Sequence, residues 1–227
     1  MKINQSGRSM IEMLGVLAII GVLSIGGIAG YSKAMAKYRT NKIIDQISHI
    51  ITNIRTAYTD QASFIHLDNE LAIDMGAIPS ELMVENLANN AAGKLRNVFG
   101  GRVFIEASST SGSGEDDEVL KDAFVITTYN MPREACMSIA TSDWGSGSSS
   151  GLLAMHVYSR MNAKADPTSI DEVIDAVTKY DTGTIQQGSA IAVPGDSKVK
   201  VPLNVDQART ACYCPNKSIC AVSWKFY

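Results

Sequence analysis

The chain has 227 residues and a mass of 24.3 kDa, enough for one sizeable domain with an appendage or for two small domains. It carries 20 basic and 23 acidic residues, and this net charge of −3 argues against nucleic-acid binding by the bulk of the chain. The mean hydropathy of +0.03 conceals one strongly apolar segment near the N-terminus. A purely soluble protein, a polytopic transporter and a disordered chain are therefore all excluded.

The apolar segment at 13–30 contains 18 consecutive residues without a charge. A membrane-spanning helix needs roughly 20 predominantly apolar residues, so we predict a transmembrane segment over 10–30. A removable signal peptide has a shorter apolar core of about 7–15 residues, followed by a cleavage site. Here the run continues into residues 31–38, which contain good helix formers and no proline, so we expect the helix to continue beyond the membrane.

Glu12 lies at the start of this apolar segment. A carboxylate within a membrane span costs on the order of 2.5–3.5 kcal/mol on insertion scales, which marks it as a candidate functional residue. The simpler alternative is that Glu12 lies among the lipid headgroups and only marks the border of the span.

The sequence around Glu12, SGRSMIEMLGVLAIIGVL at 6–23, resembles the class III signal of type IV prepilins. In that family a short polar leader ends in Gly, the prepilin peptidase cuts after it, the new N-terminus is methylated, and Glu is the fifth mature residue. The resemblance thus implies a leader over 1–7, a cut between Gly7 and Arg8, N-methylation of Arg8 and a role for Glu12 in assembly. Arg8 departs from the Phe, Met, Leu or Val that the family usually has after the cut.

The charges that flank the span conflict with this resemblance. Lys2 and Arg8 precede the span, whereas four basic residues follow it: Lys33, Lys37, Arg39 and Lys42. By the positive-inside rule the C-terminal side would be cytoplasmic. The resemblance and the cysteines indicate a periplasmic head instead, and we give them more weight than a small charge bias.

Beyond the span the pattern becomes amphipathic. Apolar residues recur at steps of three and four between 43 and 58, with polar residues between them, which predicts one buried stripe. We expect one helix from Ser9 to Thr59, about 75 Å long at 1.5 Å per residue, and we assign 8–59 to it and 60–227 to a globular head.

The head is predicted to be α+β, with an antiparallel sheet packed on the amphipathic half of the long helix. Strand-like runs lie at 103–107, 123–129, 152–158 and 219–226. Short helices are expected at 78–83, 168–180 and 204–211. Two Ser/Gly-rich stretches, 108–118 and 145–151, are expected to be surface loops.

The head is also similar to type IVb pilins. The similarity rests on GAIP at 76–79, NVFGGRV at 97–103, MPREAC at 131–136 and a late cysteine before a final aromatic strand. The resemblance touches most of the chain, strongly at 1–35 and loosely thereafter.

The four cysteines are Cys136, Cys212, Cys214 and Cys220. An even number in an exported domain implies two disulfides, with three possible connectivities. The family's defining bridge joins a Cys of the short helix after the second strand, matched by Cys136, to a Cys near the C-terminus. Any of the other three could be its partner; we favour Cys212, which leaves Cys214 and Cys220 to close a small loop. A zinc site is the alternative, although the paired Cys-x-x-Cys spacing is missing.

The sequence offers no case for catalysis, a cofactor or a metal. It contains no nucleophile elbow, phosphate-binding loop or metal-ligand helix, and its three histidines are scattered. His49 and His66 are expected to face solvent or a helix contact. Asp116 and Asp117 could be offered as a calcium site, but a solvated acidic turn explains them better.

The sequence thus predicts a structural pilin subunit, held in the bacterial inner membrane with a periplasmic head and then assembled into an extracellular type IV pilus, or fimbrium. Its expected partners are further copies of itself in a helical filament, the prepilin peptidase and the inner-membrane assembly machinery. One alternative is a type II secretion pseudopilin or a minor pilin. Another is a bitopic inner-membrane protein with a periplasmic head.

Overall fold

The structure, a computed structural model, describes residues 10–83, 95–110, 121–145, 150–160, 183–196, 198–214 and 219–227. The chain divides into two compact units, Met1–Arg39 and Thr40–Tyr227. Several predictions fall outside the described residues: the leader with Gly7 and Arg8, the helix at 168–180, and the pair Asp116 and Asp117.

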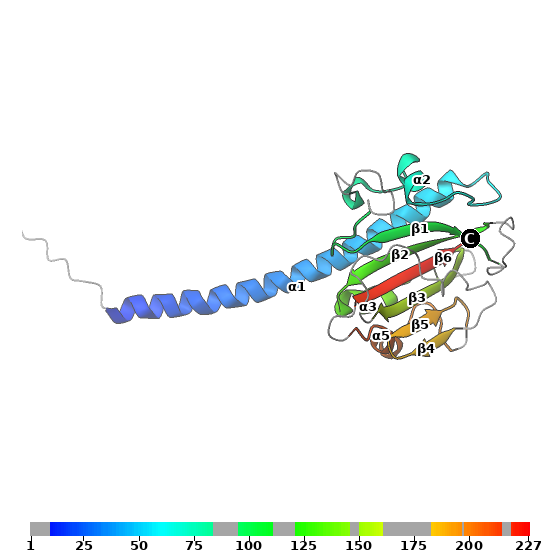
Figure 1. Cartoon of the computed structure of the whole chain (residues 1–227). Coiled ribbons are helices and arrows are strands. Elements are labelled where there is room, and N and C mark those ends of the chain that lie inside the picture. The colour runs from blue at the N-terminus through cyan, green and yellow to red at the C-terminus, as the bar shows by residue number, and fades with distance from the viewer. Residues whose placement is uncertain are drawn as a thin grey trace, which may run out of the picture. The chain divides into compact units, whose positions relative to one another are not determined.

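Helix α1 runs without interruption over Met10–Ala57, which confirms the predicted long helix and ends two residues before the predicted Thr59 (Figure 1). It is long and apolar enough to cross a membrane. The large apolar side chains of its first half are exposed in the isolated chain; Ile11 is 78% and Leu23 68% accessible.

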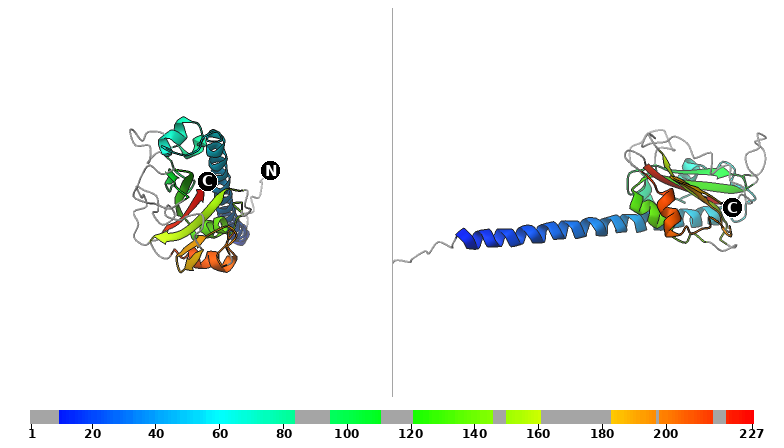
Figure 2. Two further views of the ribbon diagram at one scale, coloured as in Figure 1. Left: turned by 90° about the vertical axis from the view of Figure 1, so that its right-hand side faces the viewer. Right: turned by 90° about the horizontal axis from the view of Figure 1, so that it is seen from below.

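The second half of α1 buries the stripe that the isoleucine spacing predicts. Its buried residues are Thr40, Ile43, Gln46, Ile47, Ile50, Ile51 and Ile54. Ile50 and Ile54 are wholly inaccessible, and they belong to the same apolar cluster as the strands of the head. Within the second unit, this part of α1 runs along one face of the sheet (Figure 2).

The head contains a six-stranded sheet in which every pairing is antiparallel. Its strands are β1 (Val103–Ser108), β2 (Ala123–Met131), β3 (Leu152–Arg160), β4 (Thr184–Gln186), β5 (Ser189–Ala192) and β6 (Ile219–Phe226). Their order across the sheet is β1-β2-β6-β3-β5-β4, so the last strand of the chain lies between β2 and β3 (Figure 1). The predicted α+β fold is therefore confirmed.

Both faces of the sheet are apolar, because side chains alternate along each strand. On β6, Val222, Trp224 and Phe226 join the cluster that contains α1, whereas Ala221 joins a smaller cluster with Phe104, Val125, Tyr129, Ala154 and Tyr158. The pairing of β2 with β6 shifts register between Thr128 and Met131, where Asn130 has a φ of 58°.

Short helices complete the head. They are α2 (Asn69–Asp74), the 3₁₀ helix η1 (Ser80–Leu82), α3 (Arg133–Ala140) and α5 (Val205–Ala211). Asp68 caps α2 by accepting a hydrogen bond from the backbone N–H of Leu71 at 2.8 Å. Asn204 and Gln207 form a capping box at the start of α5, where the sequence predicts a helix.

The structure adds β4 and β5, which the sequence analysis does not predict. β4 has only three residues, all exposed, and β5 is the short run Ser189–Ala192. Neither gives the alternation of apolar and polar residues over four to eight positions by which a strand is recognised.

Candidate functional site

Glu12 lies in the first turn of α1 and is exposed, as are its apolar neighbours Ile11 and Met13. An acidic residue in a first helical turn also interacts favourably with the helix dipole. The carboxylate is thus presented on an apolar helix surface within the unit Met1–Arg39. Gly7 and Arg8, the predicted cleavage and methylation residues, lie outside the described part of the chain.

The apolar half of α1 contains five glycines: Gly15, Gly21, Gly26, Gly27 and Gly30. At each of them, a Cβ atom would find no other atom within 4 Å beyond the helix's own backbone and the adjacent residues. Packing within the isolated chain therefore does not account for these glycines. Small residues at such positions allow another helix to approach closely in an apolar environment.

Two disulfides join the cysteines in the favoured connectivity, Cys136 to Cys212 and Cys214 to Cys220. The Cα atoms of the first pair are 5.9 Å apart and link α3 to the C-terminal end of α5 across a sequence separation of 76. The second pair ties the segment after α5 to β6. All four thiols are consumed in these bonds, so the zinc alternative is wrong.

Arg55 connects the end of α1 to the end of the central strand. Its guanidinium donates hydrogen bonds to the backbone carbonyls of Ser150 at 2.5 Å and Tyr227 at 2.9 Å. It also lies 5.5 Å from the centre of the Phe226 ring, a cation–π distance. Burial lowers the pKa of Arg55, but a guanidinium stays protonated in proteins.

Gly151 makes room for this contact. A Cβ atom there would overlap the Arg55 guanidinium, and the residue's φ of 73° also favours glycine. The backbone carbonyl of Gly151 also accepts a hydrogen bond from the N–H of Tyr227 at 3.0 Å. Arg55 and Gly151 thus hold together three segments that are far apart in the sequence.

A second polar contact lies near the start of the buried half of α1. Lys42 Nζ pairs with the Glu81 carboxylate at 2.7 Å, and Gln46 Nε2 donates to the same carboxylate at 3.2 Å. These hydrogen bonds, that from Lys42 first, lower the pKa of Glu81. The contact ties η1 to α1 at the edge of the core.

Asn69 and Asn97 satisfy backbone groups of the sheet. Asn69 donates to the Val103 carbonyl at 3.0 Å and accepts from the Ile105 N–H at 2.8 Å, so its side chain occupies the outer edge of β1. Covering an edge strand in this way prevents unwanted pairing with other strands. Asn97 donates to the Tyr129 carbonyl at 2.6 Å and accepts from the N–H of Gly101 at 3.1 Å.

Asp196 organises the segment that follows β5. Its carboxylate accepts hydrogen bonds from the backbone N–H groups of Gly183 at 3.0 Å, Lys198 at 2.6 Å and Val199 at 2.9 Å. These bonds, that from Val199 first, lower the pKa of Asp196. Because hydrogen bonds to the ionised form favour it, the carboxylate keeps its charge below the usual pH range.

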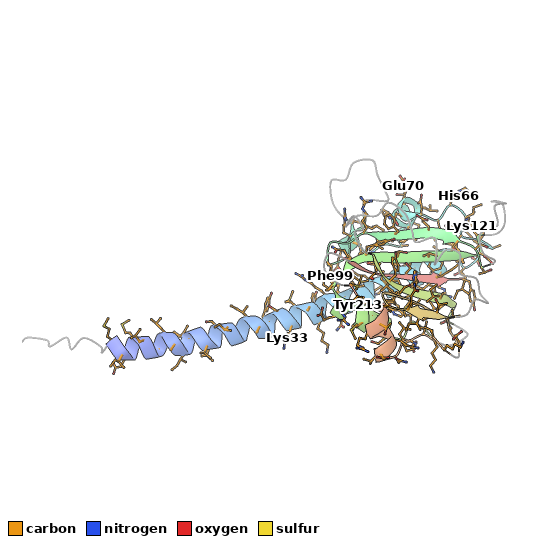
Figure 3. All side chains as sticks on the ribbon, turned by 60° about the horizontal axis from the view of Figure 1, so that its bottom comes forward. Lys33, His66, Glu70, Phe99, Lys121 and Tyr213 are labelled. Atoms are coloured by element: carbon orange, nitrogen blue, oxygen red, sulfur yellow. A yellow bond between two sulfur atoms is a disulfide. The ribbon has the colours of Figure 1, made fainter. Side chains whose placement is uncertain are left out.

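Among the residues that the structure describes, no histidine belongs to a group of His, Cys, Asp or Glu residues that could hold a metal ion. His49 and His66 are exposed, as predicted, and His66 is labelled in Figure 3. His156 is buried on β3, where its ring stacks on Tyr158 at 4.5 Å and its Nε2 lies 3.0 Å from the hydroxyl of Ser189. These contacts explain His156 as a packed and hydrogen-bonded core residue.

Sequence reasoning does not identify Arg55, Asn69 or Asp196 as important residues. Arg55 and Asn69 act on backbone groups 34 or more residues away, so no local pattern marks them. Asp196 does carry a local signal, because Asp commonly accepts hydrogen bonds from the backbone a few residues further on in turns.

Three comparisons with known proteins bear on these observations. The family model described as PilS N terminal matches residues 37–187. The chain belongs to this family. It is a type IV pilin, most similar to type IVb pilins, as the resemblance implies.

Among solved structures, a type IV b pilin from Salmonella typhi matches at 17% identity and a TM-score of 0.42, covering 78% of this chain and 93% of that one. TcpA, a type IV pilin from Vibrio cholerae El Tor biotype, matches at 12% identity and a TM-score of 0.43, with coverage of 84% and 99%. A search of curated proteins finds no match to the chain.

Proposed function

We propose that this pilin is a structural subunit of a type IV pilus, cut between Gly7 and Arg8 by the prepilin peptidase and polymerised through its N-terminal helix. Residues 10–30 hold the subunit in the inner membrane before assembly, with the head at 60–227 in the periplasm. The inner-membrane assembly machinery then moves it into an extracellular filament. The subunit is not an enzyme, in line with a family of structural proteins.

The observation that carries this proposal is the exposed apolar surface of the first half of α1. Burying such a surface, from Met10 to Ile28, requires either lipid or other helices. The open space beside the five glycines suits close helix packing in a filament. The same half of α1 can therefore serve in the membrane first and in the filament afterwards.

Glu12 is the proposed assembly residue. After the cut, the new α-amino group on Arg8 has an ordinary pKa near 7.7–8.0 and is largely protonated at neutral pH. In an apolar environment a carboxylate and an ammonium are both costly unless they are paired. A pair between Glu12 of one subunit and the N-terminus of the next would set the axial register of the filament, because apolar contacts alone tolerate sliding.

Coexpression with a prepilin peptidase, followed by intact-mass measurement, tests the processing step. We expect a product that begins at Arg8 and carries one additional methyl group. A product that still begins at Met1 would refute processing and favour a bitopic membrane protein.

Glu12→Gln and Glu12→Val test the assembly step in cells in which the parent chain forms filaments. Both variants should be cut, inserted and folded normally, yet be incorporated into sheared filaments far less than the parent. Glu70→Gln, the same change at an exposed carboxylate of the head, is the matched control and should assemble normally (Figure 3). Normal assembly of Glu12→Val would show that Glu12 is only a border residue.

A pseudopilin or minor pilin is the second candidate. Both share the processing and the helix, and a minor pilin differs from a major subunit in being incorporated sparsely. Quantifying the chain in purified filaments distinguishes a major from a minor pilin, because a major subunit makes up most of the filament protein.

A further inference from the structure

A band of cationic and aromatic residues follows the apolar segment of α1. We call it the collar; it consists of Tyr31, Lys33, Lys37, Tyr38 and Arg39. All five side chains are exposed, with Tyr31 67% and Tyr38 58% accessible, and Figure 3 shows Lys33 standing out from the helix. All five belong to the unit Met1–Arg39.

The three cations of the collar have no acidic partner among the residues that the structure describes. Lys42, the next basic residue along α1, differs in this respect, because it pairs with Glu81 at 2.7 Å. The positive charge of Lys33, Lys37 and Arg39 is thus available to a ligand from outside the described chain.

The collar residues surround the helix rather than forming one stripe. At about 100° per residue, Lys33 and Lys37 lie within about 40° of each other, and Tyr31 and Tyr38 within about 20°. Arg39 occupies a third sector. Gaps of about 80–120° around the helix axis separate the nearest members of the three groups. A single partner subunit contacts one face of a helix, whereas lipid headgroups surround it.

The distance from the apolar segment also matches the lipid headgroups. With 1.5 Å of rise per residue, the collar extends from about 1.5 Å to about 14 Å beyond Gly30. The headgroup region adds about 5–7 Å to each side of the hydrocarbon core. Side chains on a helix lean toward its N-terminus, so the long basic side chains reach back toward that region. Tyrosine is enriched at this depth in membrane proteins.

From this arrangement we infer that the collar binds the phosphate groups of anionic phospholipids at the membrane surface. The inference rests on the proposed anchoring of residues 10–30 in the membrane. It also offers a reason for the basic residues, which oppose export of the head under the positive-inside rule. Each cation near an anionic surface strengthens the attraction, and mobile lipids can arrange themselves around all three sectors.

A second copy of the chain is the competing occupant. The unit Met1–Arg39 contains five basic and one acidic residue, whereas the unit Thr40–Tyr227 contains 15 basic and 22 acidic residues, so the two carry opposite net charge. This attraction requires only one face of the helix, however, and leaves the distribution of the collar around the axis unexplained.

Native mass spectrometry of the full chain in a nonionic detergent tests the inference. The chain is titrated with phosphatidylglycerol and, separately, with phosphatidylcholine, and bound lipids are counted in each spectrum. The parent should bind phosphatidylglycerol more tightly. The triple variant Lys33→Gln, Lys37→Gln, Arg39→Gln should lose on the order of 100-fold in apparent affinity, about fivefold for each charge. Glutamine is as good a helix former as lysine, so α1 should persist.

The matched control removes the same charge from exposed positions of the head: Arg133→Gln, Lys198→Gln, Lys200→Gln. It should bind phosphatidylglycerol as the parent does. Equal losses in both triple variants would reduce the effect to net charge and overturn the inference. Unchanged lipid binding by the collar variant would also overturn the inference. If the parent then showed a dimer that the collar variant lost, a second copy would be the occupant. Because the measurement needs neither processing nor assembly, failure of either in cells refutes the proposed function without affecting this result.

Discussion

The two halves of α1 contain similar apolar residues and use them in opposite ways. In the first half Ile20 is 52% accessible, whereas in the second half Ile50 is fully buried against the sheet. The second half acquires its stripe from polar residues inserted between the isoleucines, whereas the first half is apolar on all sides. A helix that is apolar all round requires an apolar environment from outside the chain, and an amphipathic helix can be satisfied by its own domain.

The contrast separates stability from assembly. Changes in the second half, or in the contacts that hold it, should alter the free energy of unfolding of the head. Changes in the first half should alter membrane association and polymerisation while the head remains folded. The full chain in detergent micelles is suited to testing this separation. The buried pair Trp144 and Trp224, with ring centres 4.6 Å apart, provides a fluorescence signal for unfolding of the head.

The largest effect should come from the disulfide between Cys136 and Cys212. The double variant Cys136→Ser, Cys212→Ser should lower the free energy of unfolding by about 4 kcal/mol, because the bridge closes a long loop in the unfolded chain. Urea unfolding followed by tryptophan fluorescence measures the loss, and membrane insertion should be unchanged.

The second disulfide is the control for the length of the closed loop. Cys214 and Cys220 are separated by only six positions, so Cys214→Ser, Cys220→Ser should cost about 2 kcal/mol in the same model. Equal losses for the two double variants would show that loop entropy does not govern the stability of the head.

The next prediction compares the halves of α1 directly. Ile50→Ala should lower the free energy of unfolding of the head by about 3 kcal/mol, since it leaves a cavity in the core. Ile20→Ala makes the same chemical change at an exposed position and should leave the unfolding midpoint unchanged. A midpoint shift of the same size in both variants would contradict the division of α1 into two roles.

Arg55 tests the attachment of α1 to the central strand. Arg55→Gln should cost about 2 kcal/mol, a typical loss for hydrogen bonds from a charged donor. Arg55→Lys should recover only part of it, because an ammonium cannot reproduce the planar fork of the guanidinium. Hydrogen exchange at Tyr227 should accelerate in both. Arg133→Gln, at an exposed position, is the control, and a loss equal to that of Arg55→Gln would refute a specific role for Arg55.

Much of the fold follows from local patterns. The uncharged apolar run predicts the first half of α1 and the isoleucine spacing its second half, and β6 is predicted at its observed bounds. β4 is missed because its three residues are stabilised by neighbours in the sheet rather than by their own pattern. Local sequence carries little information about segments whose structure depends on distant partners.

The candidate site divides in the same way. The resemblance to prepilins identifies Glu12 and its spacing from Gly7, and the resemblance to type IVb pilins guides the pairing of Cys136. No pattern could identify Arg55 or Asn69, because their roles depend on which carbonyls the fold brings within reach. Asp196 lies between these cases: two of its three donors are local, at Lys198 and Val199, and one is Gly183, 13 residues away.

Asp196, in the segment that follows β5, provides the smallest of the predicted effects. Its lowered pKa means that the folded state keeps the carboxylate ionised where the unfolded chain, with an ordinary pKa near 3.8, takes up a proton. The stabilisation is therefore fully present above about pH 4 and is lost as the pH falls through the lower folded pKa. Asp196→Asn removes this titration, so its unfolding midpoint should fall less steeply than that of the parent between pH 5 and pH 3.

Glu81→Gln is the variant to compare with Asp196→Asn, because the pKa of Glu81 is also lowered, by Lys42 of α1. It should reduce the acid sensitivity of stability in the same direction, while acting at the attachment of α1 rather than in the segment after β5. Hydrogen exchange separates the two sites: acid should lower the protection of the Gly183 and Val199 amides, relative to their intrinsic exchange rates, in the parent. This response should persist in Glu81→Gln but disappear in Asp196→Asn. An identical response at these two amides in all three proteins would show that Asp196 does not organise the segment through its charge.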